Sequence, residues 1–381
     1  MTSPPFGDQR PPDNPEPDPA LAGFPPPQPL APGPYAPQPY APYGPLPSGL
    51  TAPAAQGLAY PVPAPAPLSA LPTEPRPYHQ MLRGPLFRWW KPVLTLLLAV
   101  ALYIPLVVLS LVPLIVVGVA SGASDLGLLG FDVKNLSPTG FVVVNLSLIA
   151  MIPVSGLSIW IVHLIRPRYL SSVVGGIRWR WLARCVLIVL PLWLAYLALG
   201  LLVVPPDPAR PAQWLPLLII VLTMTPFQAA GEEYLFRGWL MQNIGAYFSR
   251  PILGLVVSVA VSAVAFAAAH GSRDPWIFGS IGCMAIAACV AVYRTGGLEA
   301  AIAMHAVNNV LAFGAVLMFG GWNEAFVGAD TQGTPAVLVL AILVQGGALA
   351  LILWQARRHG IQSRYRPHVV SAELAYSNDP R

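Results

Sequence analysis

Charged residues are scarce in this chain of 381 residues: Asp, Glu, Lys and Arg together make up 10%, against about 25% in soluble domains. Hydrophobic residues make up 55%, which excludes an ordinary water-soluble globular domain. The three cysteines, Cys185, Cys283 and Cys289, lie in apolar runs without metal-ligand spacing, so neither a disulfide framework nor a zinc ribbon is expected. The basic residues behind the net charge of +5 are dispersed, and no nucleic-acid partner is predicted.

The N-terminal segment, residues 1–85, is rich in proline and holds 27 of the 45 prolines. Such a segment cannot bury enough apolar surface to offset its ordering entropy, so we predict a disordered, cytoplasmic tail with polyproline II character. It is either an inert extension or an arm that recruits a partner with an aromatic-lined groove. No basic stretch followed by an apolar core opens the chain, so no cleaved secretory signal is expected.

The body of the chain, residues 86–358, is a series of apolar stretches of the length that a helix needs to cross about 30 Å of hydrocarbon. We expect eight spans, at 93–119, 140–165, 183–204, 214–240, 252–271, 276–293, 298–319 and 335–355. The sequence therefore predicts an all-α, polytopic membrane helical bundle, followed by a C-terminal tail at 359–381.

The basic residues beside the spans predict the orientation of the bundle. They gather before the first span (Arg83, Arg88, Lys91), after the second (Arg166, Arg168, Arg178, Arg180, Arg184) and after the last (Arg357, Arg358, Arg364, Arg366). By the positive-inside rule these segments are cytoplasmic. We therefore predict a multi-pass protein of the plasma membrane with both termini in the cytoplasm, which requires an even number of spans.

The fourth span carries two carboxylates and a guanidinium within six residues, Glu232, Glu233 and Arg237. Each such group costs about 2.5 to 3.5 kcal/mol at the centre of a membrane helix, so the cluster is expected to face a polar cavity rather than lipid. Glu233 and Arg237 are spaced i and i+4, and they can pair on one face. Glu232 then keeps a free carboxylate, although the two glutamates could exchange roles. An interfacial ion pair without function is the alternative.

Two further polar islands lie in later spans. The fifth ends with Phe266 and His270 on one helical face, and the seventh places His305 and Asn309 on one face, with Asn308 as a second candidate. A single buried histidine is commonly a packing residue. Two glutamates, two histidines and an asparagine on three spans can together supply a general base, proton donors and an oxyanion partner.

The ordered series Glu232-Glu233-x-x-x-Arg237, Phe266-x-x-x-His270 and His305-x-x-x-Asn309 resembles the CPBP family of intramembrane proteases, which includes the type II CAAX prenyl endopeptidases and abortive-infection and bacteriocin-processing relatives. The resemblance covers about residues 214–320. It implies hydrolysis of a peptide bond in a membrane-associated substrate, with Glu232 activating water. His270 would help to hold that water, His305 and Asn309 would stabilise the oxyanion, and Glu233 and Arg237 would shape the site.

The cofactor requirement has two readings. Glu232, His270 and His305 are acceptable zinc ligands, and the family is often described as metalloproteases. The His-Glu-x-x-His arrangement of familiar zinc proteases is absent from the sequence, and Asn309 is a poor zinc ligand. We favour a glutamate mechanism that requires no cofactor, with zinc as the alternative.

The expected span boundaries conflict with a closed site. They place Glu232 and His305 toward the cytoplasmic half of the membrane and His270 toward the outer half. These side chains lie at the same depth in the membrane only if the fourth helix continues to about residue 247, or if the fifth begins later and passes His270 toward Trp276.

Two other functions fit the same residues. The polar cluster could serve a non-catalytic transporter or immunity and scaffold protein, although no paired half-repeats support this, or the chain could be an inactive protease. A prenylated substrate requires a prenylation system. Arg outnumbers Lys 19 to 2, which hints at a GC-rich bacterial genome and favours peptide maturation, bacteriocin self-protection or membrane-protein turnover instead.

Overall fold

A computed structural model describes residues 69–120, 137–203, 210–322 and 325–367 of the chain. The chain divides into two units, Met1–Ala64 and Pro65–Arg381, and every described residue belongs to the second. Most of the predicted tail therefore lies outside the described residues.

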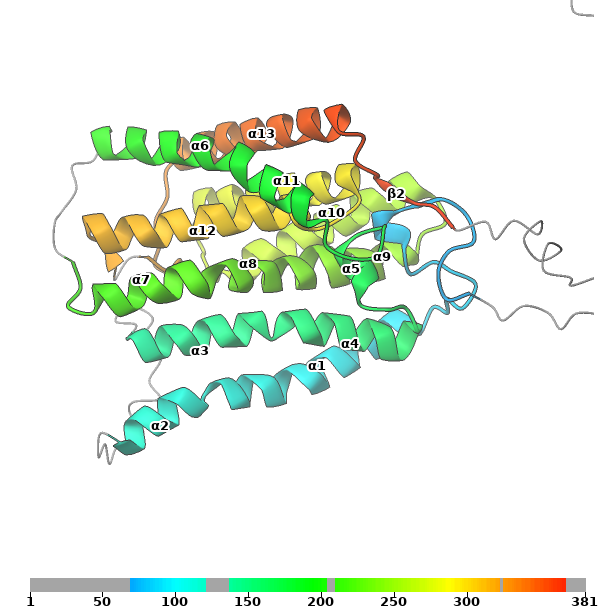
Figure 1. The fold of residues 1–381 in the computed structure, drawn as a ribbon, viewed down its shortest axis with the longest axis horizontal. Coiled ribbons are helices and arrows are strands. Elements are labelled where there is room, and N and C mark those ends of the chain that lie inside the picture. The colour runs from blue at the N-terminus through cyan, green and yellow to red at the C-terminus, as the bar shows by residue number, and fades with distance from the viewer. Residues whose placement is uncertain (1–68, 121–136, 204–209, 323–324, 368–381) are drawn as a thin grey trace, which may run out of the picture. The chain divides into compact units, whose positions relative to one another are not determined.

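The second unit consists almost entirely of helices (Figure 1). Their bounds are α1 Lys91–Ser110, α2 Val112–Ala120, α3 Pro138–Ile149, α4 Met151–His163, α5 Arg168–Ser171, α6 Trp179–Val203, α7 Trp214–Thr223, α8 Thr225–Glu233, a π-helical segment Tyr234–Leu240, α9 Met241–Ala246, α10 Pro251–Ala269, α11 Pro275–Thr295, α12 Glu299–Phe319 and α13 Pro335–Arg358. A short 3-10 turn, Tyr78–Gln80, precedes them. The prediction of an all-α polytopic bundle is confirmed.

In the described part of the chain, seven helical stretches are long and apolar enough to cross a membrane. The bent pair Trp214–Thr223 and Thr225–Ala246, with an angle of 42° between its halves, makes an eighth if it is one span. The bend coincides with Pro226 at the start of α8, because a proline ring clashes with the carbonyl one turn earlier and provides no N–H. The number and order of the predicted spans agree with these helices.

Both ends of the bundle's chain meet on one side. Strand β1 (Arg76–Pro77), which precedes α1, pairs antiparallel with β2 (Arg364–Tyr365), which follows α13. The chain therefore enters and leaves the bundle at the same end, as an even number of crossings requires.

The predicted disordered segment extends too far along the chain. From residue 69 the backbone has a defined place, and Tyr78, Met81 and Leu82 are almost completely buried. The hydroxyl of Tyr78 donates to the carbonyl of Leu170, and Arg83 donates from Nη1 to the carbonyl of Ala246, 2.9 Å away, at the end of α9. The run Tyr-His-Gln-Met-Leu interrupts the proline pattern with side chains that can pack, so residues 69–85 are not disordered as predicted.

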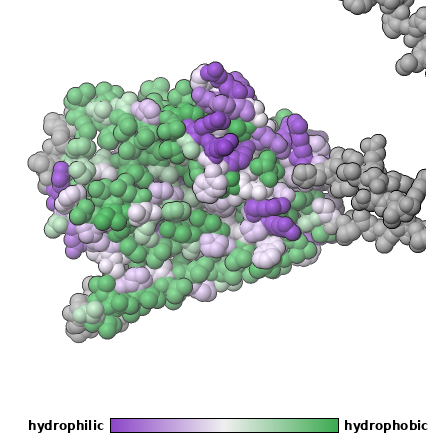
Figure 2. Space-filling model, in the orientation of Figure 1, coloured by the Kyte–Doolittle hydropathy of each residue, from purple (hydrophilic) through white to green (hydrophobic). Residues whose placement is uncertain are grey.

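The bundle is apolar outside and partly polar inside. Large hydrophobic side chains are exposed along the helices, including Leu97, Val119 and Leu202, and Figure 2 shows hydrophobic surface over much of the viewed face. The hydrophilic residues on that face gather mainly where α13 ends and β2 begins. The interior of α12 contains small alanines together with Glu299 and His305, both buried. Small residues allow the close helix approach that packing in lipid requires.

Candidate active site

The helix that carries both glutamates lies very close to its neighbour. Gly231 packs against the backbone at Leu148, and a Cβ atom at this position would collide with the carbonyl oxygen of that residue. Glycine therefore lets α8 approach α3 closely. The next residue is Glu232, whose side chain is 12% exposed, and Glu233 follows with none of its side chain exposed.

Glu233 and Arg237 form the ion pair that their spacing predicts. Nη1 of Arg237 donates to Oε1 of Glu233 over 2.9 Å, and both side chains are fully buried. The pair lies across the change from α8 to the π-helical segment, a kind of irregularity that is frequent at functional sites. Nε and Nη2 of Arg237 have no hydrogen-bond partner in the described part of the chain. The guanidinium instead lies over the ring of Phe266, 4.1 Å from its centroid.

His305 lies between the two glutamates, one at each ring nitrogen. Its Nδ1 is 2.8 Å from Oε1 of Glu233, and its Nε2 is 3.2 Å from Oε2 of Glu232. The first contact is a hydrogen bond. The second is within ion-pair distance, but its atoms are not aligned as a hydrogen bond. Oε1 of Glu233 already accepts from Arg237, and we assign Nδ1 of His305 as the donor in the first contact. The second is attractive only with one proton between Nε2 and Oε2.

His270 presents a defined nitrogen as well. It follows the last residue of α10, and its Nδ1 is 2.9 Å from the carbonyl oxygen of Phe266. A carbonyl oxygen only accepts, so Nδ1 is the donor. In the neutral ring, Nε2 is then an acceptor. The ring of Phe266 contacts both histidines, with centroids 4.8 Å from that of His270 and 5.6 Å from that of His305.

A cavity of about 410 Å³ brings the predicted residues together. Glu232, His270, His305 and Asn309 line it, whereas Glu233 and Arg237 are buried behind it. Its other described walls are largely apolar and include Phe141, Phe313 and Phe326. The cavity is large enough for water and a peptide segment, and the helices supply convergent polar groups at one place.

The conflict between span boundaries and site closure is resolved by the fourth helix. It continues without interruption from Thr225 to Ala246, past the predicted end at 240 and close to the required residue 247. The alternative, a fifth helix that passes His270 toward Trp276, is wrong, because α10 ends at Ala269 and α11 begins at Pro275. Sequence periodicity underestimated the fourth helix because its last turns are more polar.

Gln228 is a residue of the site that the sequence analysis missed. It lies one helical turn before Glu232, it is 7% exposed, and it lines the cavity. Nδ2 of Asn309 donates to its Oε1 over 3.2 Å. The i, i+4 spacing to Glu232 was the available signal.

The residues proposed as zinc ligands do not form a metal site in this arrangement. Among the described residues, no group of three or more His, Cys, Asp and Glu side chains is placed to hold a metal ion. Nδ1 of His270 and Nδ1 of His305 are both engaged as donors, and Nε2 of His305 faces Glu232.

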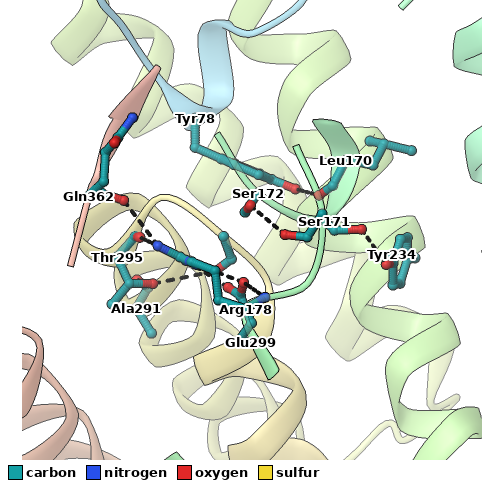
Figure 3. A network of polar contacts seen from close by, with 12 residues as sticks. Tyr78, Leu170, Ser171, Ser172, Arg178, Tyr234, Ala291, Thr295, Glu299 and Gln362 are labelled. Carbon is teal, nitrogen blue, oxygen red and sulfur yellow. Dashed lines mark hydrogen bonds and ion pairs between the residues drawn. The ribbon is translucent and has the colours of Figure 1, made fainter. Parts of the chain in front are cut away.

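A second polar network anchors the helices of the site (Figure 3). Glu299, the first residue of α12 and fully buried, accepts from Nε and Nη2 of Arg178 over 2.8 and 2.7 Å. Nη1 of Arg178 also donates to the carbonyls of Thr295 and Gln362. Arg178 was expected to be a basic residue beside the membrane, and it is instead a bidentate partner that fixes the start of the helix carrying His305.

The same region holds the turn after Glu233. The hydroxyls of Tyr234 and Ser171 lie 2.6 Å apart, and Figure 3 shows Tyr78, Leu170 and Ser171 converging on this segment. The end of α5 and the connection that follows it therefore tie the glutamate helix and the histidine helix to one framework.

A comparison with protein families finds a match to the part of the chain that carries the site. Residues 212–311 match the family model described as Type II CAAX prenyl endopeptidase Rce1-like. Residues 212–311 are therefore similar to an Rce1-like domain. The match covers about a quarter of the chain and includes every predicted site residue. Searches of the curated proteins and of the solved structures gave no significant match.

The Rce1-like match confirms the resemblance to CPBP proteases that the three motifs indicate. Together with the apolar helices, it identifies a multi-pass membrane protein and supports a CAAX-type intramembrane protease.

Proposed function

We propose that the chain is an endopeptidase of the plasma membrane that hydrolyses a peptide bond in a membrane-associated substrate, with Glu232 as general base. The observation that carries this proposal is the common cavity of Glu232, His270, His305 and Asn309. Glu233 is already engaged by Arg237, so Glu232 is the carboxylate that is free to take a proton from water. For this reason we propose Glu232, rather than Glu233, as the base.

The contacts of His305 with Glu232 and Glu233 favour a resting state in which Glu232 can accept a proton from water. With a proton on Nε2 of His305, the side chains of Arg237 and His305 both present N–H groups to the carboxylates of Glu233 and Glu232. A water molecule in the cavity can donate one hydrogen to Glu232 and the other to Nε2 of His270. The lone pair on its oxygen then faces the substrate carbonyl.

The tetrahedral intermediate requires donors for its oxyanion. Nδ2–H of Asn309 lies in the same cavity, and Nε2–H of His305 becomes available once Glu232 has taken the proton from water and no longer competes for it. The proton that Glu232 takes from water passes to the nitrogen of the leaving amine, and the peptide bond breaks. Water adds across the bond, so the step requires no further reactant.

The orientation and substrate are part of this proposal. Both termini are placed in the cytoplasm, because the basic residues gather on the connections next to them. The apolar walls of the cavity favour an uncharged peptide segment. The Pro-rich tail is a candidate site for a partner.

Comparison of protein termini in membranes tests the proposed function. Cells that produce wild-type protein should contain new termini in membrane-associated proteins, and cells that produce Glu232→Gln should lack them. Glu74→Gln, which changes an exposed glutamate outside the bundle, is the matched control. Identical termini in the wild type and in Glu232→Gln, with loss of the cellular phenotype only on deletion of residues 1–64, would favour a scaffold instead.

A further inference from the structure

We propose that Gln228 is a second amide donor to the oxyanion, and that Trp193 and Asn308 are positioning residues that set the direction of the amides of Asn309 and Gln228. This inference rests on the proposed hydrolysis and adds residues outside the three motifs.

Four side chains from three helices form one chain of hydrogen bonds. Nε1 of Trp193, in α6, donates to Oδ1 of Asn308 over 3.1 Å. Nδ2 of Asn308 donates to Oδ1 of Asn309 over 3.0 Å, and Nδ2 of Asn309 donates to Oε1 of Gln228 over 3.2 Å. Asn308 and Asn309 lie in α12, and Gln228 lies in α8.

The indole of Trp193 determines the direction of donation along this series of hydrogen bonds. An amide can be rotated by half a turn so that its oxygen and nitrogen exchange places, and either orientation can satisfy an amide neighbour. An indole N–H, in contrast, only donates. Trp193 therefore requires the oxygen of Asn308 on its side, which turns the nitrogen of Asn308 toward Asn309. The same constraint passes on to Gln228.

This direction leaves unused N–H donors on Asn309 and Gln228, at the end of the hydrogen-bond series that lies near Glu232. Nδ2 of Asn309 keeps one hydrogen after its bond to Gln228. Nε2 of Gln228 keeps two, because it makes no hydrogen bond to any described residue. Gln228 is more than nine-tenths buried, it lines the cavity, and it lies on the same helical face as Glu232. A buried amide with unused N–H groups is matched to an acceptor that arrives with the substrate.

The chemistry of that acceptor is a peptide carbonyl that becomes an oxyanion. Donors that are already oriented stabilise the developing charge without reorganisation, and each one removed from such a site costs about 10² to 10³ in kcat. If the amides were reversed, carbonyl oxygens would face the oxyanion and repel it. Trp193 also lines the cavity, and we assign its effect on the reaction to this orientation of the amides.

Trp181 provides a matched control for Trp193. Both indoles belong to α6 and are buried in the same core cluster, but Nε1 of Trp181 has no hydrogen-bond partner among the described residues. Trp193→Phe and Trp181→Phe therefore remove the same atoms from one cluster, and only the first removes the bond to Asn308. Because Trp193 also lines the cavity, KM shows whether its replacement changes substrate binding. Gln228→Met removes the amide and keeps the length of the side chain.

Kinetics in detergent micelles, with a quenched fluorescent peptide spanning a cleavage site mapped in membranes, test the proposal. We expect Gln228→Met to lower kcat about 10²-fold and Trp193→Phe to lower it about tenfold. KM should stay within twofold in both variants, and Trp181→Phe should match wild type. Equal kcat in Trp193→Phe and Trp181→Phe, or wild-type kcat in Gln228→Met, would overturn the proposal.

A spectroscopic measurement tests the chain of amides independently of cleavage. The ultraviolet Raman difference between wild type and Trp193→Phe isolates the indole band that reports hydrogen bonding, which should be that of a bonded N–H. A band of a free N–H would overturn the inference. Absence of cleavage by wild-type protein alongside a bonded band would count against the proposed hydrolysis and leave the amide geometry supported.

Discussion

Nδ1 of His305 lies 2.8 Å from Oε1 of Glu233, although the two residues are separated by 72 positions in the chain. This bond fixes the register of α12 against the helix that carries both glutamates. It also turns Nε2 of His305 toward Glu232, which precedes Glu233 in the sequence. One imidazole therefore couples a fully buried ion pair to a carboxylate that reaches the cavity.

The close packing at Gly231 predicts that adding a single methyl group there lowers both the stability and the activity of the protein. Gly231→Ala would push α8 away from the backbone at Leu148. We expect a loss of about 1 to 3 kcal/mol, as for other overpacked sites, and a fall in activity because Glu232 moves. Gly282→Ala, in α11, meets no atom within 4 Å and should leave the unfolding temperature unchanged or raise it. Thermal unfolding in detergent compares the two, and equal stability of the variants would contradict the close packing.

The ion pair between Arg178 and Glu299 should be worth far more than an exposed pair. Glu299→Gln leaves a largely buried guanidinium without its carboxylate, which typically costs about 3 to 5 kcal/mol. The pair of Arg76 and Glu74 is the control, since the side chain of Glu74 is 74% exposed, and Glu74→Gln should change stability little. Denaturation of the purified variants measures both. A Glu299→Gln protein as stable as Glu74→Gln would show that the network in Figure 3 is not an anchor.

His79 should make the fold sensitive to acid. Burial lowers the pKa of His79 from 6.5 to about 4, and its Nε2 donates to the carbonyl of Pro251 over 3.0 Å. Between pH 6.5 and 4 the unfolded chain binds the extra proton and the folded one does not, so stability falls as pH falls through this window and is constant with respect to His79 above it. The gap corresponds to about 3 kcal/mol.

The glutamine variant isolates that effect. His79→Gln keeps a donor for the carbonyl of Pro251 and cannot titrate. Unfolding temperatures from pH 7.5 to pH 4.5 should therefore fall less steeply in His79→Gln than in wild type. Parallel curves for the two proteins would show that protonation of His79 does not oppose folding.

Chelation separates the glutamate mechanism from a metal mechanism. Because the described His, Cys, Asp and Glu residues form no group of three or more placed for a metal ion, we expect full peptide cleavage in the presence of 1,10-phenanthroline. The assay uses protein pretreated with the chelator and then dialysed. Loss of activity that added zinc restores would require Glu232, His270 and His305 to rearrange as ligands.

Much of the fold could be predicted from sequence because hydrocarbon imposes a length on each apolar helix. The spans from Pro251 and from Glu299 begin within one residue of their predicted starts. The pairing of Glu233 with Arg237 was also predictable, since i, i+4 spacing is a local property. The segment that includes Tyr78 was missed because its burial depends on contacts with Leu170 and with the chain beyond α13.

The shared contact of His305 could not be predicted in the same way. Glu232 and Glu233 point in different directions on a helix, and nothing local to α8 or α12 indicates that one ring meets both. The same holds for Gln228, whose place depends on the register of Asn309 across two helices. The relation among the three motifs was available only through their resemblance to a family.

Cleavage by purified Glu232→Gln is the most direct measurement. Glutamine keeps the shape of the side chain and cannot accept a proton from water at neutral pH, so kcat should fall by about 10² to 10⁴, the usual contribution of a general base. The unfolding temperature should match that of wild type, because Glu232 reaches the cavity and Glu233 keeps its ion pair with Arg237. A folded Glu232→Gln protein that cleaves at the wild-type rate would contradict Glu232 as the base.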